Sequence, residues 1–202
     1  MANGTQRSSN ALDPFLEEAG CALFAAMDTP VTSVARAGAP VAEEASVMGV
    51  VGFVNEQMSG ALCVIASVEV AAELRPRGTD DSTPSQAALL DGINELANML
   101  LGRIKTLLAR RGISVLLSTP TASISEKLRV SPPPTEGAAW YAFTLPQGPV
   151  YARIALRIDP ALVLDGACTE RRMEPMAEGE MMMLLPKRAT RADARTVPTK
   201  LD

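Results

Sequence analysis

Residues 85–111 read SQAALLDGINELANMLLGRIKTLLARR and hold the most regular pattern in the chain. Ser85 or Pro84 can open a helix here, and Gly112, directly after the run, can end it. With about 100° of rotation per residue, the apolar positions fall within about 60° of Ile93 on one face. These positions are Leu89, Ile93, Leu96, Ala97, Leu100, Ile104, Leu107 and Leu108. The run therefore predicts a long central helix with one face packed on a sheet.

The opposite face of this helix carries Asp91, Glu95, Asn98 and Gly102, which lie within an arc of about 60°. Glu95 and Asn98 are three residues apart and are therefore surface neighbours. Gly102 costs the helix about 1 kcal/mol relative to alanine, which suggests that something approaches the helix closely there. The plainer interpretation is solvated surface, because a Glu-x-x-Asn pair alone occurs by chance in many helices.

The residues before the central helix predict a helix and then strands. Asp13 as an N-cap and Pro14 in the first turn indicate a helix over residues 13–27. β-Branched residues and spaced glycines then indicate strands, two of which form an antiparallel hairpin. The expected elements are a strand in 31–38, the hairpin strands 46–54 and 60–67, and a short helix over 68–74.

The residues after the central helix predict further strands. Residues 113–118 and 120–125 are strand-like, and residues 138–145 and 149–158 form a second hairpin around a Pro-Gly turn. Helices interleaved with hairpins predict an α+β (mixed α/β) fold, in which a mostly antiparallel sheet packs against two or three helices.

Composition suggests one domain with short extensions. Residues 1–10 are polar and predict a disordered leader, and residues 11–164 hold the expected domain. Residues 165–202 turn to Glu, Arg, Met and Pro and predict a flexible, Met- and Arg-rich tail.

Charge and residue usage exclude several classes of function. The chain has 202 residues and a net charge of −4. It has no histidine, and this absence excludes histidine-based nucleophilic catalysis and nearly all zinc hydrolase sites. Its acidity argues against binding to nucleic acid or an anionic membrane. With no apolar run long enough to cross a bilayer and no signal peptide, we expect a cytoplasmic protein. Cys21 and Cys63 stand in apolar runs and are expected to be buried.

Residues 95–105, ELANMLLGRIK, resemble the E-[IL]-x-N-M-x-x-G-x-x-K signature of the CheX/CheC/FliY chemotaxis phosphatases. The resemblance extends to residues 12–27, 50–67 and 112–125, so it covers roughly residues 11–158. The chain departs from the family shortly after its S-x-P-T element, where the family usually has a glycine and this chain has Ser125 nearby. It also has a single Glu-x-x-Asn motif, which indicates the CheX-like branch, whose members are known as dimers.

The resemblance implies a phosphatase that hydrolyses the aspartyl phosphate of a CheY-like response-regulator receiver domain. Asn98 would orient the attacking water, and Glu95 would engage the receiver's active-site lysine. Asp91, Met99 and Gly102 would contact the partner. The receiver would supply the Mg²⁺ and the phosphorylated aspartate, so this chain would need no metal or cofactor of its own. Phosphoryl transfer relies on positioning rather than a strong base, which suits a chain without histidine.

Two alternatives stay open at this point. The same fold could serve as a non-catalytic module that binds a receiver or a component of the flagellar switch. The motif could also be accidental, in an unrelated interaction protein. Loss of phosphate from a phosphorylated receiver separates the enzyme from the binding module.

Overall fold

The structure is a computed structural model that describes residues 11–42, 44–74, 84–129, 139–159 and 162. The expected leader and tail, residues 1–10 and 165–202, lie outside these described residues. In the described part, no helix is both long enough and apolar enough to span a bilayer.

The helices are α1 (Asp13–Ala26), α2 (Val68–Glu73) and α3 (Gln86–Ala109). The expected start of α3 is confirmed, because the Ser85 hydroxyl accepts a hydrogen bond from the Ala88 N–H at 3.2 Å. Just beyond α3, Gly112 has a φ of +78°, a left-handed conformation that favours glycine and ends the helix.

The start of α1 differs in detail from the expectation. Leu12, not Asp13, is the N-cap residue. Asp13 is only 5% exposed, and its Oδ2 accepts a hydrogen bond from Arg36 Nη2 on the following strand at 2.8 Å. The prediction of Asp13 as the cap is therefore wrong, since a cation distant in sequence draws its carboxylate away from the helix end.

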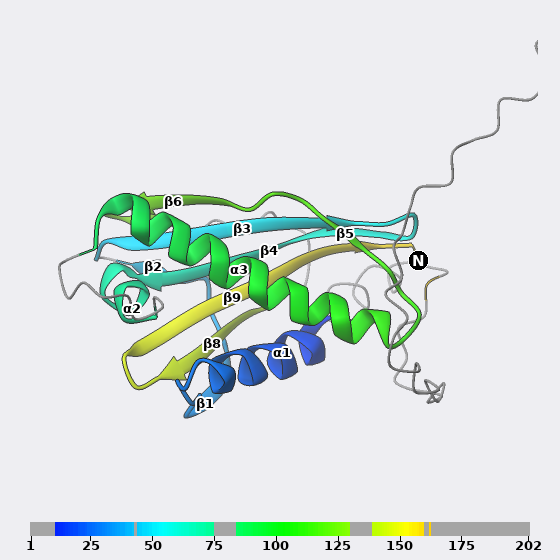
Figure 1. The fold of residues 1–202 in the computed structure, drawn as a ribbon, viewed down its shortest axis with the longest axis horizontal. Coiled ribbons are helices and arrows are strands. Elements are labelled where there is room, and N and C mark those ends of the chain that lie inside the picture. Colours follow the sequence, from blue (N-terminus) through cyan, green and yellow to red (C-terminus); the bar gives the residue numbers. More distant parts are fainter. Residues whose placement is uncertain (1–10, 43, 75–83, 130–138, 160–161, 163–202) are drawn as a thin grey trace, which may run out of the picture. The chain divides into compact units, whose positions relative to one another are not determined.

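The strands are β1 (Ser33–Ala37), β2 (Val41–Ala42), β3 (Ser46–Val54), β4 (Met58–Ser67), β5 (Leu116–Leu117), β6 (Thr121–Ser125), β7 (Leu128–Arg129), β8 (Trp140–Leu145) and β9 (Gly148–Ile158). The main sheet has the order β1-β8-β9-β4-β3-β5, with β6 also paired to β3 (Figure 1). Every pairing is antiparallel, including the small separate β2–β7 pair. The α+β fold with a mostly antiparallel sheet is confirmed.

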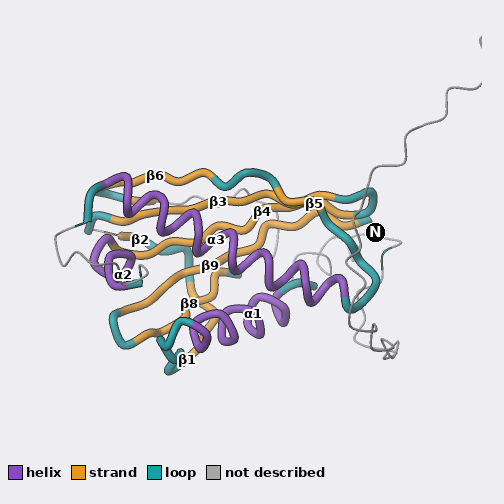
Figure 2. Tube along the Cα trace, in the orientation of Figure 1, coloured by secondary structure: helices purple, strands orange, loops and turns teal. Residues whose placement is uncertain are grey.

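One face of the main sheet carries the core. Phe143 of β8 pairs with Val150 of β9, Val150 with Ala66 of β4, and Ala66 with Val47 of β3. All four lie on the same face and are at most 1% exposed. Figure 2 shows α1 and α3 lying across the strands, and the two helices pack against each other and on this face. The sheet is thus the platform on which α3 rests.

Some of the remaining predictions from the sequence are confirmed and others are not. Both hairpins and the short helix α2 are confirmed, but only Leu116 and Leu117 of the predicted strand 113–118 pair with β3. Cys21 is exposed, because α1 turns its neighbours Gly20 and Leu23 to the core instead. Cys63 is half-buried on β4.

Candidate functional site

The outward face of α3 presents the polar residues that the sequence singles out. Asp91, Glu95 and Asn98 are all exposed, and Gly102 follows them along the same side of the helix. We refer to these four positions as the outward face. Glu95 and Asn98 lie about one helical turn apart, so their carboxylate and carboxamide can contact one ligand together.

The opposite side of α3 is buried as predicted. Its buried residues are Leu89, Ile93, Leu96, Ala97, Leu100, Leu101, Ile104 and Leu108. Leu101 was not part of the predicted stripe, and Leu107 is half-buried rather than buried. The buried stripe is wider than predicted, and α3 packs not only against the central strands but also against α1, α2 and β6.

A glycine of the sheet seats the helix. A Cβ on Gly49 of β3 would stand 2.9 Å from the backbone oxygen of Ile93, closer than real side chains approach. The absence of a side chain at Gly49 therefore lets the α3 backbone lie directly on β3. This contact fixes the height of α3 above the sheet one turn before Asn98.

Gly102 has a different environment. Apart from the helix's own nearby backbone, no atom of the described chain lies within 4 Å of where its Cβ would be. Its carbonyl accepts a hydrogen bond from the Thr106 hydroxyl at 3.0 Å, one turn on, which is an ordinary local contact. Nothing in the fold of the described residues requires glycine at this position.

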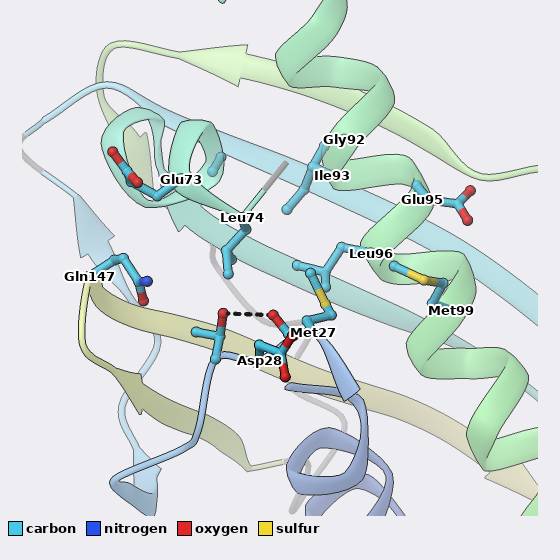
Figure 3. A pocket seen from close by; sticks show the side chains of 12 residues that line it. Met27, Asp28, Glu73, Leu74, Gly92, Ile93, Glu95, Leu96, Met99 and Gln147 are labelled. Atoms are coloured by element: carbon cyan, nitrogen blue, oxygen red, sulfur yellow. Dashed lines mark hydrogen bonds between the residues drawn. The ribbon is translucent and has the colours of Figure 1, made fainter. Parts of the chain in front are cut away.

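A groove of about 650 Å³ runs alongside the outward face. Its floor is apolar and comes from three separate parts of the chain, because Met27 follows α1, Leu74 follows α2, and Ile93, Leu96 and Met99 belong to α3. Figure 3 shows the side chains of Met27, Leu74 and Leu96 turned towards one another across it.

The rim of the groove is acidic. Asp28, Glu73 and Glu95 line it, together with Gln147 from the turn between β8 and β9. Glu95 lies on α3 at the edge of the groove, and its carboxylate points outward in Figure 3. The groove and the outward face therefore share Glu95.

Met99 and Asn94 flank the Glu95–Asn98 pair in different ways. Met99 is half-buried, packs against the core and lines the groove, so it is both a core residue and a surface that a partner can reach. The Oδ1 of Asn94 is buried without a hydrogen-bond partner among the described residues. Neither the burial of Asn94 nor the groove could be predicted from the sequence, because both depend on segments that meet only in the folded chain.

The clearly perturbed ionisable groups lie away from this site. Burial raises the pKa of Asp13, opposed by hydrogen bonds from Tyr141 and Arg36. Burial also raises the pKa of the Cys63 thiol to about 11. Among the described residues no cluster of His, Cys, Asp or Glu could hold a metal ion. The outward face offers a carboxylate at Glu95 and a carboxamide at Asn98, groups that can bind and position a ligand.

Comparisons with known proteins show a likeness to one family. Residues 47–144, which include all but the first residue of β3 and the whole of β4, α2 and α3, match the family described as chemotaxis phosphatase CheX. No curated protein matches the sequence. The resemblance to this phosphatase family is therefore confirmed across the segment that holds Glu95 and Asn98.

Solved structures agree on the fold. A CheC-like protein from Shewanella oneidensis MR-1 matches with 18% identity and a TM-score of 0.59, covering 73% of this chain and 98% of that chain. CheX from Vibrio vulnificus matches with 18% identity and a TM-score of 0.56, covering 74% and 97%. The CheX–CheY–BeF3–Mg complex from Borrelia burgdorferi contains a chain that matches with 20% identity and a TM-score of 0.56, covering 73% and 97%.

Proposed function

This chain carries a CheX-type domain across residues 47–144, and from that premise we propose that it is a phosphatase acting on the aspartyl phosphate of a CheY-like receiver domain. The observation that carries the proposal is the exposed pair Glu95 and Asn98, side by side on α3 within the matching segment. The related CheX complex with CheY, BeF3 and Mg supports a receiver as the partner.

In the proposed reaction, Asn98 positions the attacking water. Its carboxamide both donates and accepts hydrogen bonds, so it can hold a water in line with the phosphorus–oxygen bond of the aspartyl phosphate. The water oxygen bonds to phosphorus as that bond breaks, which frees the aspartate carboxylate and inorganic phosphate. The transition state is loose, so orientation matters more than a strong base.

Glu95 is proposed to fix the docking register by pairing with the receiver's active-site lysine. Charge complementarity of this kind chiefly sets orientation and association rate. Asp91 and Met99 border the same contact, and the bare surface at Gly102 lets the receiver's loops come close to the helix.

The rest of the proposal concerns cofactors, assembly and location. The receiver supplies the Mg²⁺ that offsets charge on the phosphoryl group, and this chain contributes no metal or cofactor. The acidic composition of the chain argues against nucleic acid as a partner, and we place the protein in the cytoplasm, in chemotaxis or another two-component pathway. The single motif favours the CheX-like branch and a possible homodimer.

The experiment that tests the function follows phosphate release from a phosphorylated receiver with Mg²⁺ present, with and without a substoichiometric amount of this protein. A panel of CheY-like receivers from the protein's own organism is used, because the sequence does not identify the substrate. Accelerated release over several turnovers supports the enzyme. Binding to the receiver without acceleration supports the non-catalytic module instead, and neither binding nor acceleration overturns both.

A further inference from the structure

The groove beside α3 differs in chemistry from the outward face. Its floor is formed by apolar side chains, including Met27, Leu74 and Leu96, whereas Asp28 and Glu73 stand on its rim. None of its lining residues in the described part of the chain is Lys or Arg. An apolar hollow with an acidic edge favours a ligand that places an apolar group inside and a positive charge at the rim.

The rim carboxylates are open to solvent and, in the part of the chain that the structure describes, no partner neutralises them. Asp28 and Glu95 are exposed, and so is Glu73 on the last turn of α2. Within the described residues, none of the three forms an ion pair. Their combined negative field therefore extends into solvent, where it can attract a cationic partner.

The groove is continuous with the proposed catalytic contact. Glu95 belongs both to the outward face and to the groove wall, and Met99, four residues on, also lines the groove. A receiver that docks over Glu95 and Asn98 must therefore cover the mouth of the groove or leave an open apolar surface beside the contact.

We infer that the groove is a second receiver-binding subsite, which takes an apolar side chain of the receiver flanked by Lys or Arg side chains that pair with Asp28 and with Glu73. This inference rests on the proposed function. The volume of about 650 Å³ lies within the range of roughly 300–1,000 Å³ that is common for ligand pockets, so the hollow is large enough for a side chain.

The subsite gives the two parts of the interface separate tasks. Asn98 acts on the phosphoryl group, while the groove selects the receiver by its surface at some distance from the chemistry. Receivers share their active-site groups, so discrimination among them has to come from contacts outside those groups. The groove is such a contact.

The first test locates the receiver by NMR. The protein is labelled with ¹³C at methionine methyl groups and titrated with a receiver held in its active form by beryllofluoride and Mg²⁺. We expect the methyl signal of Met27, on the groove floor, to shift. Met48 of β3 serves as the control, because it alternates with the buried Val47 and points to the other face of the sheet. A shift at Met99 without one at Met27 confines the contact to the α3 edge of the groove and overturns the subsite.

The second test removes rim charge at constant shape. Asp28→Asn is compatible with the positive φ of 54° at this position, because asparagine tolerates that conformation. Glu73→Gln is matched by Glu69→Gln, an exposed control on the same helix that does not line the groove. We expect each groove variant to weaken receiver binding about two- to fivefold at low salt, with the difference shrinking at high salt. Equal affinities for Glu73→Gln and Glu69→Gln overturn the inference.

The outcomes also separate this inference from the function on which it rests. If the wild type accelerates phosphate release but Met27 and the rim variants report no contact, the subsite falls and the phosphatase stands. If the wild type neither binds nor dephosphorylates any receiver, both fall together. A Met27 shift produced by a small amphipathic cation alone, with none from the receiver, assigns the groove to a small ligand and likewise overturns the receiver subsite.

Discussion

Two glycines distinguish the two faces of α3. Gly49 lies under the buried face, where an added Cβ would meet the backbone oxygen of Ile93 at 2.9 Å. Gly102 lies on the outward face, where no atom of the described chain is within 4 Å apart from the local helix backbone. The first glycine is needed by the fold itself. Among the described residues nothing requires the second, and a docked receiver is the reason we propose for it.

The same contrast holds for the polar residues. On the buried side, packing on the sheet accounts for each apolar residue from Leu89 to Leu108. On the outward side, Glu95 and Asn98 form no hydrogen bond or ion pair within the described chain that would explain their identity. Substitutions on the buried face should therefore change stability, and those on the outward face should change receiver dephosphorylation.

The largest expected effect is on the outward face. Asn98→Ala removes the proposed water-positioning carboxamide and should lower kcat/KM for receiver dephosphorylation by about a hundredfold or more. The melting temperature should stay the same, because the side chain is exposed. Gln86→Ala, an exposed change at the start of the same helix, is the control. An Asn98→Ala protein as active as this control contradicts the proposed role.

The next largest effect belongs to the buried face. Gly49→Ala forces α3 away from β3 and should lower the free energy of unfolding by about 1–3 kcal/mol. Urea denaturation measures this against Gly38→Ala, where an added Cβ meets nothing within 4 Å. A Gly49→Ala protein as stable as the Gly38→Ala control means that α3 does not rest directly on β3.

A charge reversal at Glu95 on the outward face should change receiver binding more than stability. Glu95→Lys places a positive charge opposite the receiver's lysine and should weaken binding about tenfold. Stability should change by less than about 0.5 kcal/mol, since the residue is exposed. Titration with a beryllofluoride-activated receiver measures the affinity, and thermal unfolding provides the stability. Unchanged affinity rules out the lysine pairing.

The smallest expected effect is that of Gly102→Ala, which should change stability and activity in opposite directions. Gly102→Ala should stabilise the helix by up to about 1 kcal/mol, because alanine has the higher helix propensity and open space surrounds the position. The same methyl group should obstruct the docked receiver, so catalytic efficiency should fall, and Gly102→Leu should lower it more. Both properties are measured on the same preparations. A gain in stability with activity untouched moves the docking face away from this turn.

The sequence predicts the elements whose signals are local. The spacing of apolar residues and the Ser85 cap locate α3 to within a few residues. Strand-like runs joined by short turn segments locate β3, β4, β8 and β9. The outward face follows from helix geometry alone. These features depend on neighbours within a turn or along one strand.

Features built from distant segments could not be predicted from the sequence. The edge strand β1 pairs with β8, and Asp13 binds Arg36 instead of capping α1. The groove collects residues from around Met27, from α2 and α3, and from the turn at Gln147. No periodicity connects such segments, because their contact depends on the topology of the whole sheet.

The most direct test of the account measures phosphate release in a single turnover, with the receiver saturated by wild-type protein, Asn98→Ala or Glu95→Lys. Saturation removes differences in affinity and leaves the chemical step. We expect Glu95→Lys to regain most of the wild-type rate, whereas Asn98→Ala should leave the receiver at its own slow rate of phosphate loss. If saturated Asn98→Ala matches the wild type, Asn98 does not act on the bound phosphoryl group, and the central claim is wrong.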